Sequence, residues 1–190
     1  MNSKILIIDN YDSFTYNLRQ IVEEFHYDYS IVKNDEVTFD KINKYSKILI
    51  SPGPGIPSQA GLVEKVIKQF VSSKSILGIC LGHQAIAEVF GGNLYNLSEV
   101  CHGISTNVNV KDSNDYLFNS IPRNFDAGLY HSWAVSKNNF PDCLKITSES
   151  ADGVMMSLSH IEYDVKGVQF HPESIMTKHG KQIMNNWLEH

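Results

Sequence analysis

Apolar residues in this chain form short runs rich in Ile and Leu, which alternate with longer segments where they recur every three or four positions. The short runs are typical of strands buried on both faces of a sheet, and the longer segments of helices that bury one face. Strands are expected at residues 4–8, 27–33, 47–50 and 75–77. Helices are expected at residues 14–25, 39–45, 61–71 and 85–90. Asp12 or Ser13 is the expected cap of the first helix.

The pattern changes between about Gly92 and Gly167, where short alternating runs are separated by turn residues. These runs occupy residues 105–110, 143–148, 154–158 and 165–169, and a last helix is expected at 178–188. Together the two parts predict an α/β fold. We expect an open, mostly parallel, doubly wound sheet with helices on both faces and an additional small region of antiparallel and mixed strands. No linker interrupts the pattern, so residues 1–190 are expected to form a single domain.

The composition is that of a globular protein and argues against two classes of partner. Hydrophobic residues make up 42% of the chain and charged residues 19%, and the net charge is −5. Without a basic run to neutralise phosphates, nucleic acid is not expected as a partner. No apolar run reaches the length that crosses a bilayer, so no membrane association is expected.

The cysteines and the two ends of the chain bear on the cellular setting. Cys80, Cys101 and Cys143 are too widely spaced for a disulfide framework or a zinc site, which favours reduced thiols and a cytoplasmic location. Residues 1–4 lead directly into the first strand, so no signal peptide is expected. Residues 189–190 are either native or the start of a truncated affinity tag, and they are given no role.

Gly78, Cys80 and Gly82 form a G-x-C-x-G pattern between an expected strand and an expected helix. Such an elbow presents its central residue at the edge of the sheet, and its glycines avoid clashes in the tight turn. A helix N-terminus favours a thiolate, and the N–H of Leu81 can face an oxyanion formed at Cys80. The pattern therefore nominates Cys80 as a nucleophile. The alternative is a small buried side chain in a tight turn.

The segment 51–57, rich in Pro and Gly, follows the expected strand 47–50 and predicts a rigid loop. In open α/β sheets, ligands bind at the edge where the strands have their carboxyl ends, and this loop lies there. Gly53 and Gly55, on either side of Pro54, let the backbone approach a ligand closely. The N–H of Gly55 is a candidate second oxyanion donor. The alternative is an ordinary stiff turn.

His171 and Glu173 stand on either side of a proline. A residue before proline favours an extended backbone, so His171 is expected at a strand end with Glu173 on the same side. A carboxylate beside an imidazole orients the ring, and His171 can then move the Cys80 proton to a leaving amine. The alternative is a histidine and a glutamate on a surface turn. Taken together, the three motifs supply the parts of acyl transfer through a thioester.

These motifs resemble those of the class I (triad) glutamine amidotransferases, and the resemblance runs nearly end to end. The segments that carry it are residues 52–55, 80–84 and 167–174. Three further segments are similar, more narrowly, to the glutaminase subunit (component II) of anthranilate synthase or aminodeoxychorismate synthase: residues 9–14, 130–132 and 167–188. The family implies hydrolysis of glutamine to glutamate and ammonia. The ammonia passes to a chorismate-binding synthase subunit, component I.

By position, the resemblance also implies the site residues. Cys80, His171 and Glu173 would be the catalytic triad, and the N–H groups of Gly55 and Leu81 would face the oxyanion. The residues implied to bind glutamine or the oxyanion are Gly53, Pro54, Gly55, Leu81, Gln84 and the backbone of Ser132 and Trp133. No metal or cofactor is expected on this chain, and any Mg²⁺ would belong to the partner subunit.

Three positions depart from the residues that the family usually carries. Ile104 stands where lysine is common, Leu129 where arginine is common and Trp133 where leucine is common. These departures bear on the partner contact and on the shape of the glutamine pocket, not on the triad. His83 and His131 are expected to be structural, with their rings bonded to nearby backbone groups.

Several functional hypotheses stay open at this point. The leading one is a glutaminase subunit whose ammonia makes anthranilate for tryptophan synthesis. The same subunit could serve aminodeoxychorismate synthase in the folate pathway. A stand-alone cysteine hydrolase, such as a γ-glutamyl hydrolase, would need no partner. A non-enzymatic binding module would keep the fold without reacting at Cys80.

Overall fold

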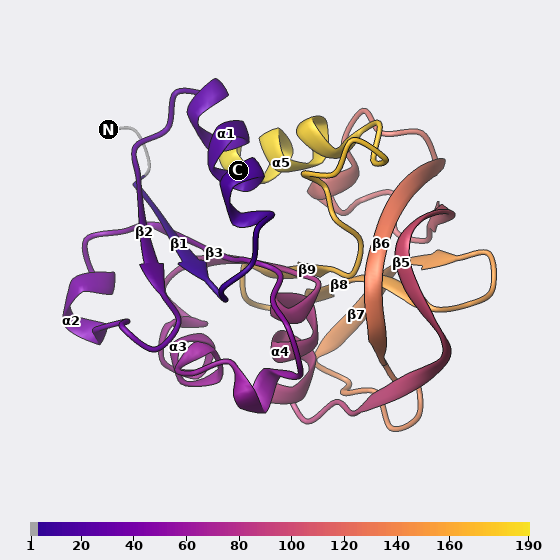
Figure 1. Ribbon diagram of the computed structural model, residues 1–190, viewed down its shortest axis with the longest axis horizontal. Coiled ribbons are helices and arrows are strands. Elements are labelled where there is room, and N and C mark those ends of the chain that lie inside the picture. Colours follow the sequence, from indigo (N-terminus) through magenta and orange to yellow (C-terminus); the bar gives the residue numbers. More distant parts are fainter. Residues whose placement is uncertain (1–3) are drawn as a thin grey trace.

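The computed structural model describes residues 4–190, which fold around one nine-stranded sheet (Figure 1). Across the sheet the strands follow the order β2-β1-β3-β4-β9-β8-β7-β5-β6. The strands are β1 (Ile5–Asp9), β2 (Tyr29–Lys33), β3 (Lys47–Ile50), β4 (Ser75–Ile79), β5 (Leu94–Val110), β6 (Asn124–Val135), β7 (Leu144–Ser150), β8 (Met155–His160) and β9 (Val165–Val168). Residues 1–3, on which the expectation of no signal peptide partly rests, lie outside the described residues.

Helices cover both faces of the sheet, as the doubly wound pattern predicts. The helices are α1 (Thr15–Glu24), α2 (Phe39–Ile42), α3 (Val63–Phe70), α4 (Leu81–Val89) and α5 (Gly180–Glu189), with short 3-10 turns η1 (Pro57–Gln59) and η2 (Tyr116–Phe118). In β1, Ile5 and Ile7 pack with α1 and α5, whereas Leu6 and Ile8 pack with α3 and α4. Figure 1 shows α1 and α5 on one side of the sheet and α2, α3 and α4 on the other.

Five parallel strands form the half of the sheet that positions the candidate chemistry. β2, β1, β3, β4 and β9 run in the same direction, so their carboxyl ends meet at one edge. The segments that follow β3, β4 and β9 are the proline-rich loop, the Cys80 elbow and the segment that carries His171. The expected convergence of the three motifs at one edge is therefore confirmed.

The other four strands continue the same sheet in antiparallel order, and this region is larger than expected. β5 begins at Leu94 rather than at residue 105, and β6 is absent from the predicted segments. β5 pairs with β7 only over residues 108–110, whereas it pairs with β6 over residues 94–96, 101–102 and 104–109. Most side chains of β5 are exposed or half-buried, so no apolar alternation marks this strand in the sequence.

Two features of the helices differ from the expectation. Neither Asp12 nor Ser13 caps α1 through its side chain; the Asp12 carboxylate instead accepts the N–H of Phe14 at 2.8 Å, in the turn before the helix. α4 begins at Leu81, directly after Cys80, rather than at residue 85. Within residues 4–190, no helix has both the length and the apolar character needed to span a membrane.

Candidate active site

Cys80 occupies the turn between β4 and α4 in a rare backbone conformation, with φ of 50° and ψ of −97°. The two glycines beside it make the turn possible. A β-carbon added at Gly78 would lie 2.4 Å from the carbonyl of Gly82, and one added at Gly82 would lie 2.8 Å from the carbonyl oxygen of Ile50. The predicted elbow is therefore confirmed as a strand–turn–helix structure. Its geometry places the thiol at the N-terminus of α4, where backbone N–H groups lack helical partners.

The imidazole of His171 and the carboxylate of Glu173 form a buried pair. The His171 Nδ1 lies 2.7 Å from the Glu173 Oε1, and the residues are only 2% and 8% exposed. The surface-turn alternative is thus wrong. Burial disfavours the charged ring, but the Cys80 thiol and the Glu173 carboxylate raise the pKa of His171 to about 10. The Nε2 makes no well-formed hydrogen bond to the described residues, so it is free to exchange a proton with the neighbouring thiol.

Aromatic side chains and backbone contacts fix the orientation of His171. The rings of Phe14 and Tyr130 lie 5.1 and 4.9 Å from its ring, centre to centre, and both meet it edge-on. The N–H of His171 donates to the Gly128 carbonyl at 3.0 Å, and the Thr177 hydroxyl donates to its carbonyl at 2.6 Å. His171 therefore sits beyond the end of β9, yet both its backbone N–H and its backbone carbonyl are hydrogen-bonded.

A small cavity of about 140 Å³ opens beside the thiol. Its walls bring together most of the residues predicted to bind glutamine or the oxyanion. The lining residues are Gly53, Pro54, Gly55, Cys80, Gln84, Tyr130, His131, Ser132 and Trp133. Of the remaining predicted residues, Leu81 follows Cys80 at the start of α4, and His171 lies next to Cys80 and is bonded to Glu173.

A chain of amide hydrogen bonds crosses this site. The Gln84 Nε2 donates to the Trp133 carbonyl at 2.8 Å and to the Gln169 Oε1 at 3.1 Å. The Gln169 Nε2 then donates to the Cys80 Sγ at 3.4 Å. Sequence reasoning missed Gln169, although the residue directly follows β9 as Cys80 directly follows β4. Gln84 bonds to the backbone carbonyl of Trp133, so this hydrogen bond does not depend on which side chain residue 133 carries.

The two buried histidines near the site differ in their contacts. The His131 Nδ1 lies 2.8 Å from the Trp133 carbonyl, which only accepts, so this nitrogen carries the proton. Its expected backbone contact is confirmed. His83 is fully buried, and burial lowers its pKa to about 3 despite the backbone of Gly167 beside it. A backbone group of Gly167 lies beside the ring, as expected, but within the described residues neither ring nitrogen of His83 makes a well-formed hydrogen bond. The ring packs tightly against Gly167, where an added β-carbon would lie 2.8 Å from the His83 Nδ1.

Asn10 holds the start of the proline-rich loop in place. Sequence reasoning also missed this residue. The Asn10 N–H donates to the Ser51 hydroxyl at 2.9 Å, and the Asn10 side chain donates to the Ser51 carbonyl at 2.8 Å. A β-carbon added at Gly53 would lie 2.5 Å from the Asn10 side chain, and Gly55 has a φ of +75°. Glycine is therefore required at both positions for the loop to reach the cavity.

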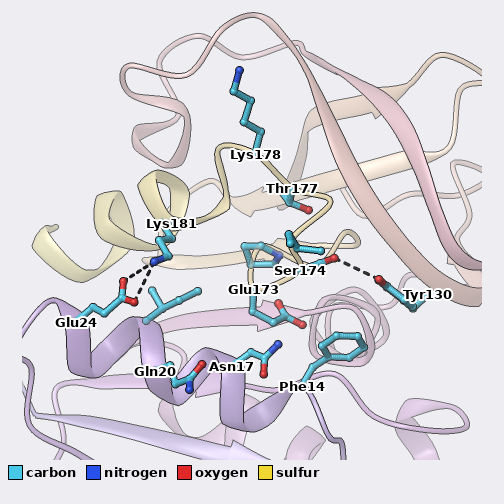
Figure 2. Close-up of a pocket in the computed structure, with 13 residues that line it drawn as sticks. Phe14, Asn17, Gln20, Glu24, Tyr130, Glu173, Ser174, Thr177, Lys178 and Lys181 are labelled. Carbon is cyan, nitrogen blue, oxygen red and sulfur yellow. Dashed lines mark hydrogen bonds and ion pairs between the residues drawn. The ribbon is translucent and has the colours of Figure 1, made fainter.

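A second and larger hollow, of about 620 Å³, lies beside Glu173, between α1 and residues 172–181 (Figure 2). Tyr130 lines both the hollow and the small cavity, and its hydroxyl lies 3.3 Å from the Ser174 hydroxyl. Figure 2 shows Phe14, directly before α1, and Asn17 of α1 facing Glu173. The buried His–Glu pair is thus flanked by two hollows, one containing the thiol and the other open along α1.

The described residues contain no group of three or more His, Cys, Asp or Glu side chains placed to hold a metal ion. The three cysteines are free thiols. The expectation that this chain carries no metal or cofactor stays a prediction.

Comparison with known proteins identifies the family. The sequence model of the class-I glutamine amidotransferases matches residues 6–190. Anthranilate synthase component 2 of Pyropia yezoensis is 44% identical over 189 residues, which cover 98% of this chain and 99% of that protein. The aminodeoxychorismate/anthranilate synthase component 2 of Bacillus subtilis is 40% identical over 187 residues, which cover 97% of this chain and 95% of that protein.

Two solved structures support the fold. A Thermoplasma acidophilum protein, provisionally assigned to GMP synthase, matches with a TM-score of 0.89 at 26% identity, covering 100% of this chain and 94% of that one. A glutamine amidotransferase of Thermotoga maritima matches with a TM-score of 0.75 at 18% identity. The match covers 100% of this chain and 82% of that one. The second match bears on the fold alone. By its sequence match, its relatives and its fold, the chain belongs to the class I glutamine amidotransferase family.

Proposed function

We propose that this chain is the glutaminase component of anthranilate synthase, which hydrolyses glutamine and delivers ammonia to a chorismate-binding synthase subunit. The observation that carries the proposal is the meeting of a thiol at a helix N-terminus, a buried His–Glu pair and a small cavity beside them. Relatives named as component 2 of anthranilate synthase, at 40–44% identity over nearly the whole chain, support this acceptor subunit.

The reaction begins with Cys80 as nucleophile. His171 accepts the thiol proton, and the sulfur attacks the side-chain carbonyl carbon of glutamine, so that a C–S bond forms. The carbonyl oxygen becomes an oxyanion that faces the N–H groups of Gly55 and Leu81. When the intermediate collapses, the C–N bond breaks and His171 gives its proton to the leaving nitrogen, which departs as ammonia. Water, deprotonated by His171, then hydrolyses the thioester to glutamate and restores the thiol.

Glu173 acts on the reaction through His171. Its carboxylate accepts from the Nδ1 at 2.7 Å, which leaves the Nε2 directed to the sulfur. The raised pKa of His171 follows from its two neighbours and favours the imidazolium that forms when the thiol loses its proton. The pair thus helps the ring retain, at neutral pH, the proton that it has taken from the thiol, so that this proton is available for the leaving nitrogen.

The far end of glutamine would be held by Gln84, Ser132 and Trp133. The Gln84 Nε2 is already engaged by the Trp133 carbonyl and by Gln169. The Gln84 Oε1 is therefore the atom left to accept from the α-ammonium group of the substrate. Backbone groups of Ser132 and Trp133 line the same cavity and would meet the α-carboxylate.

We further propose that the chain works as a single domain in the cytoplasm without a metal or organic cofactor of its own. Amide hydrolysis through a thioester needs only the nucleophile, the base and the oxyanion donors described above. Free thiols at all three cysteines suit a reducing compartment. Any Mg²⁺ would serve the chorismate-binding subunit.

The experiment that tests the proposal follows the amide nitrogen of glutamine. The chain is supplied with amide-labelled glutamine and chorismate, together with each candidate synthase subunit in turn, and the labelled product is identified. Label in anthranilate supports the proposal. Label only in aminodeoxychorismate assigns the chain to the folate pathway, and label in both products means a shared subunit. Free labelled ammonia with no labelled aromatic product discards the chorismate partner.

A matched pair of variants separates the chemistry from the assembly. Cys80→Ser is expected to abolish glutamine-dependent synthesis while leaving ammonia-dependent synthesis by the complex intact. Cys143→Ser, at a thiol outside the cavity, is the control and is expected to keep both activities. Loss of both activities in Cys80→Ser would give Cys80 a structural role. Full turnover of γ-glutamyl substrates without any partner would instead favour a stand-alone hydrolase.

A further inference from the structure

Gln169 reaches the nucleophile through the pairing of two neighbouring strands. Ile79, the last residue of β4, pairs with Val168, the last residue of β9. Cys80 and Gln169 are the next residues along these strands, and the Cys80 N–H donates to the Val168 carbonyl at 2.8 Å. The Gln169 N–H donates to the Met156 carbonyl at 2.9 Å, and its side chain is fully buried. The sheet itself therefore places the Gln169 amide against the thiol.

The Trp133 carbonyl determines the direction of the Gln169 amide, because it can only accept hydrogen bonds. The Trp133 carbonyl only accepts hydrogen bonds, so the NH₂ group of Gln84 must face it at 2.8 Å. The same NH₂ group donates to the Gln169 Oε1 at 3.1 Å, which leaves the Gln169 NH₂ group facing the Cys80 sulfur at 3.4 Å. A reversed Gln169 amide would bring two NH₂ groups together and set an oxygen against the sulfur.

We propose that Gln169 is a positioning residue that donates a hydrogen bond to the Cys80 sulfur, and that Gln84 and the Trp133 carbonyl hold it in the donating orientation. The inference rests on the proposed glutaminase function and extends it. A donor facing the sulfur favours the thiolate over the thiol and limits the rotation of the side chain. Because Gln84 also lines the glutamine cavity, one side chain connects the substrate site to the donor that faces the nucleophile.

The test measures the reactivity of the Cys80 thiol directly. Gln169→Met keeps the length of the side chain and removes the donor. Alkylation by iodoacetamide is followed between about pH 5 and pH 10 by mass spectrometry of the Cys80 peptide, which separates it from Cys101 and Cys143. We expect Cys80 in the variant to react roughly tenfold more slowly than in the wild type near neutral pH. The two rates should converge at alkaline pH, where Cys80 is ionised in both proteins.

A purely structural role predicts a different profile. If Gln169 only packed against the turn, its loss would slow alkylation by one factor at every pH, and that result would overturn the proposal. Superimposable profiles would overturn it as well. Ser157→Ala is the matched control, since it removes a buried hydroxyl on β8, next to β9, that bonds only Thr147 and Ser148 among side chains. Its alkylation profile is expected to match the wild type.

A second variant covers the case in which Gln169→Met fails to fold. Gln169→Glu keeps the shape and an acceptor for Gln84 but sets a carboxyl oxygen against the sulfur. The pH at which alkylation reaches half its maximal rate is expected to rise further than in Gln169→Met. An unchanged midpoint would overturn the donor role.

The part played by Gln84 is tested in the same assay. Iodoacetamide lacks the α-amino end of glutamine, so Gln84→Met can affect alkylation through Gln169 or through access to the cavity that Gln84 lines. A change in access would slow alkylation by one factor at every pH, whereas an effect through Gln169 would depend on pH. We expect a smaller change in the same direction, and no further change when it is combined with Gln169→Met. A Gln84→Met profile identical to the wild type would overturn the alignment by Gln84. Alkylation reports on the thiol whether or not glutamine is hydrolysed, so failure of the proposed function is recognised separately, as absence of ammonia release.

Discussion

Gly78 and Gly82 meet across the Cys80 turn so closely that a β-carbon on the first would lie 2.4 Å from the carbonyl of the second. This contact closes the elbow and forces Cys80 to a φ of 50° and a ψ of −97°, where side chains are rarely found. The strain is local and is held by the packing of α4 against the sheet. The backbone strain at the candidate nucleophile therefore lowers the stability of the fold.

That cost can be measured by exchanging Cys80 for alanine and for glycine. Neither variant has a thiol, so both are expected to lose glutamine hydrolysis. Glycine tolerates the positive φ, so Cys80→Gly is expected to have a free energy of unfolding about 1 kcal/mol larger than that of Cys80→Ala. This difference corresponds to an unfolding temperature roughly 3 °C higher. The midpoints of thermal unfolding, monitored by circular dichroism, measure this difference between the two variants. Equal midpoints would mean that the elbow stores no strain at this residue.

The sequence predicts the parallel half of the fold because its strands are buried on both faces. The runs at 47–50 and 75–77 match β3 and the start of β4, and α3 between them shows a clear apolar stripe. The antiparallel ribbon of β5 and β6 could not be found in this way. Its β5 side chains mostly face solvent, so pairing between the two strands, rather than burial, determines their length.

The residues that carry chemistry were easier to predict than the residues that hold them. Cys80 and the His171–Glu173 pair stand in motifs whose spacing has a chemical reason, and the structure brings them together. Asn10 and Gln169 act through contacts across 41 and 89 positions of the chain. No local pattern marks such partners, because the sheet order that joins them exists only in the fold.

The carboxylate of Glu173 is expected to determine the charge of His171. Glu173→Gln removes one of the two groups that raise the pKa of His171, so this pKa should fall from about 10. The alkaline limb of the pH profile for glutamine hydrolysis should then move to lower pH. The rate near neutral pH should fall by roughly a hundredfold or more, because the amide orients the ring less well.

Steady-state rates measured from about pH 6 to pH 10 check this expectation. Glu162→Gln, at an exposed position, serves as the control and should keep the wild-type profile. A Glu173→Gln profile that is lower but unshifted would mean that the carboxylate only orients His171 and does not support its charge.

Trp133 and Gln84 line the same cavity but are expected to respond differently to substitution. The contact made by Trp133 uses its carbonyl, so Trp133→Leu should change the KM for glutamine by no more than roughly threefold. Gln84→Met removes the acceptor proposed for the α-ammonium group, and the KM should rise roughly tenfold or more. Glutaminase kinetics on the two purified variants test the pair. A larger effect from Trp133→Leu would move the substrate contact from the backbone to the indole.

Asp9, at the end of β1, is expected to make the stability of the fold sensitive to acid. Burial disfavours its carboxylate, but Lys33 at 2.5 Å, the Asp12 N–H at 3.2 Å and the Thr15 hydroxyl at 3.0 Å outweigh burial and lower the pKa of Asp9 below its ordinary 3.8. A carboxyl whose pKa is lower in the folded state stabilises the fold above that ordinary value. This contribution is lost as the pH falls through the lowered pKa.

Asp9→Asn should therefore lower the free energy of unfolding by about 1 kcal/mol near neutral pH, where the half-exposed Lys33 is partly screened by solvent. The difference from the wild type should shrink as the pH falls below about 4, because the wild-type carboxyl then takes up a proton as well. Urea unfolding at a series of pH values measures it, with Asp28→Asn at an exposed position as the control. A difference that stays constant down to pH 2 would show that the charge of Asp9 contributes nothing, and that only its hydrogen bonds to Asp12 and Thr15 stabilise the turn that leads into α1.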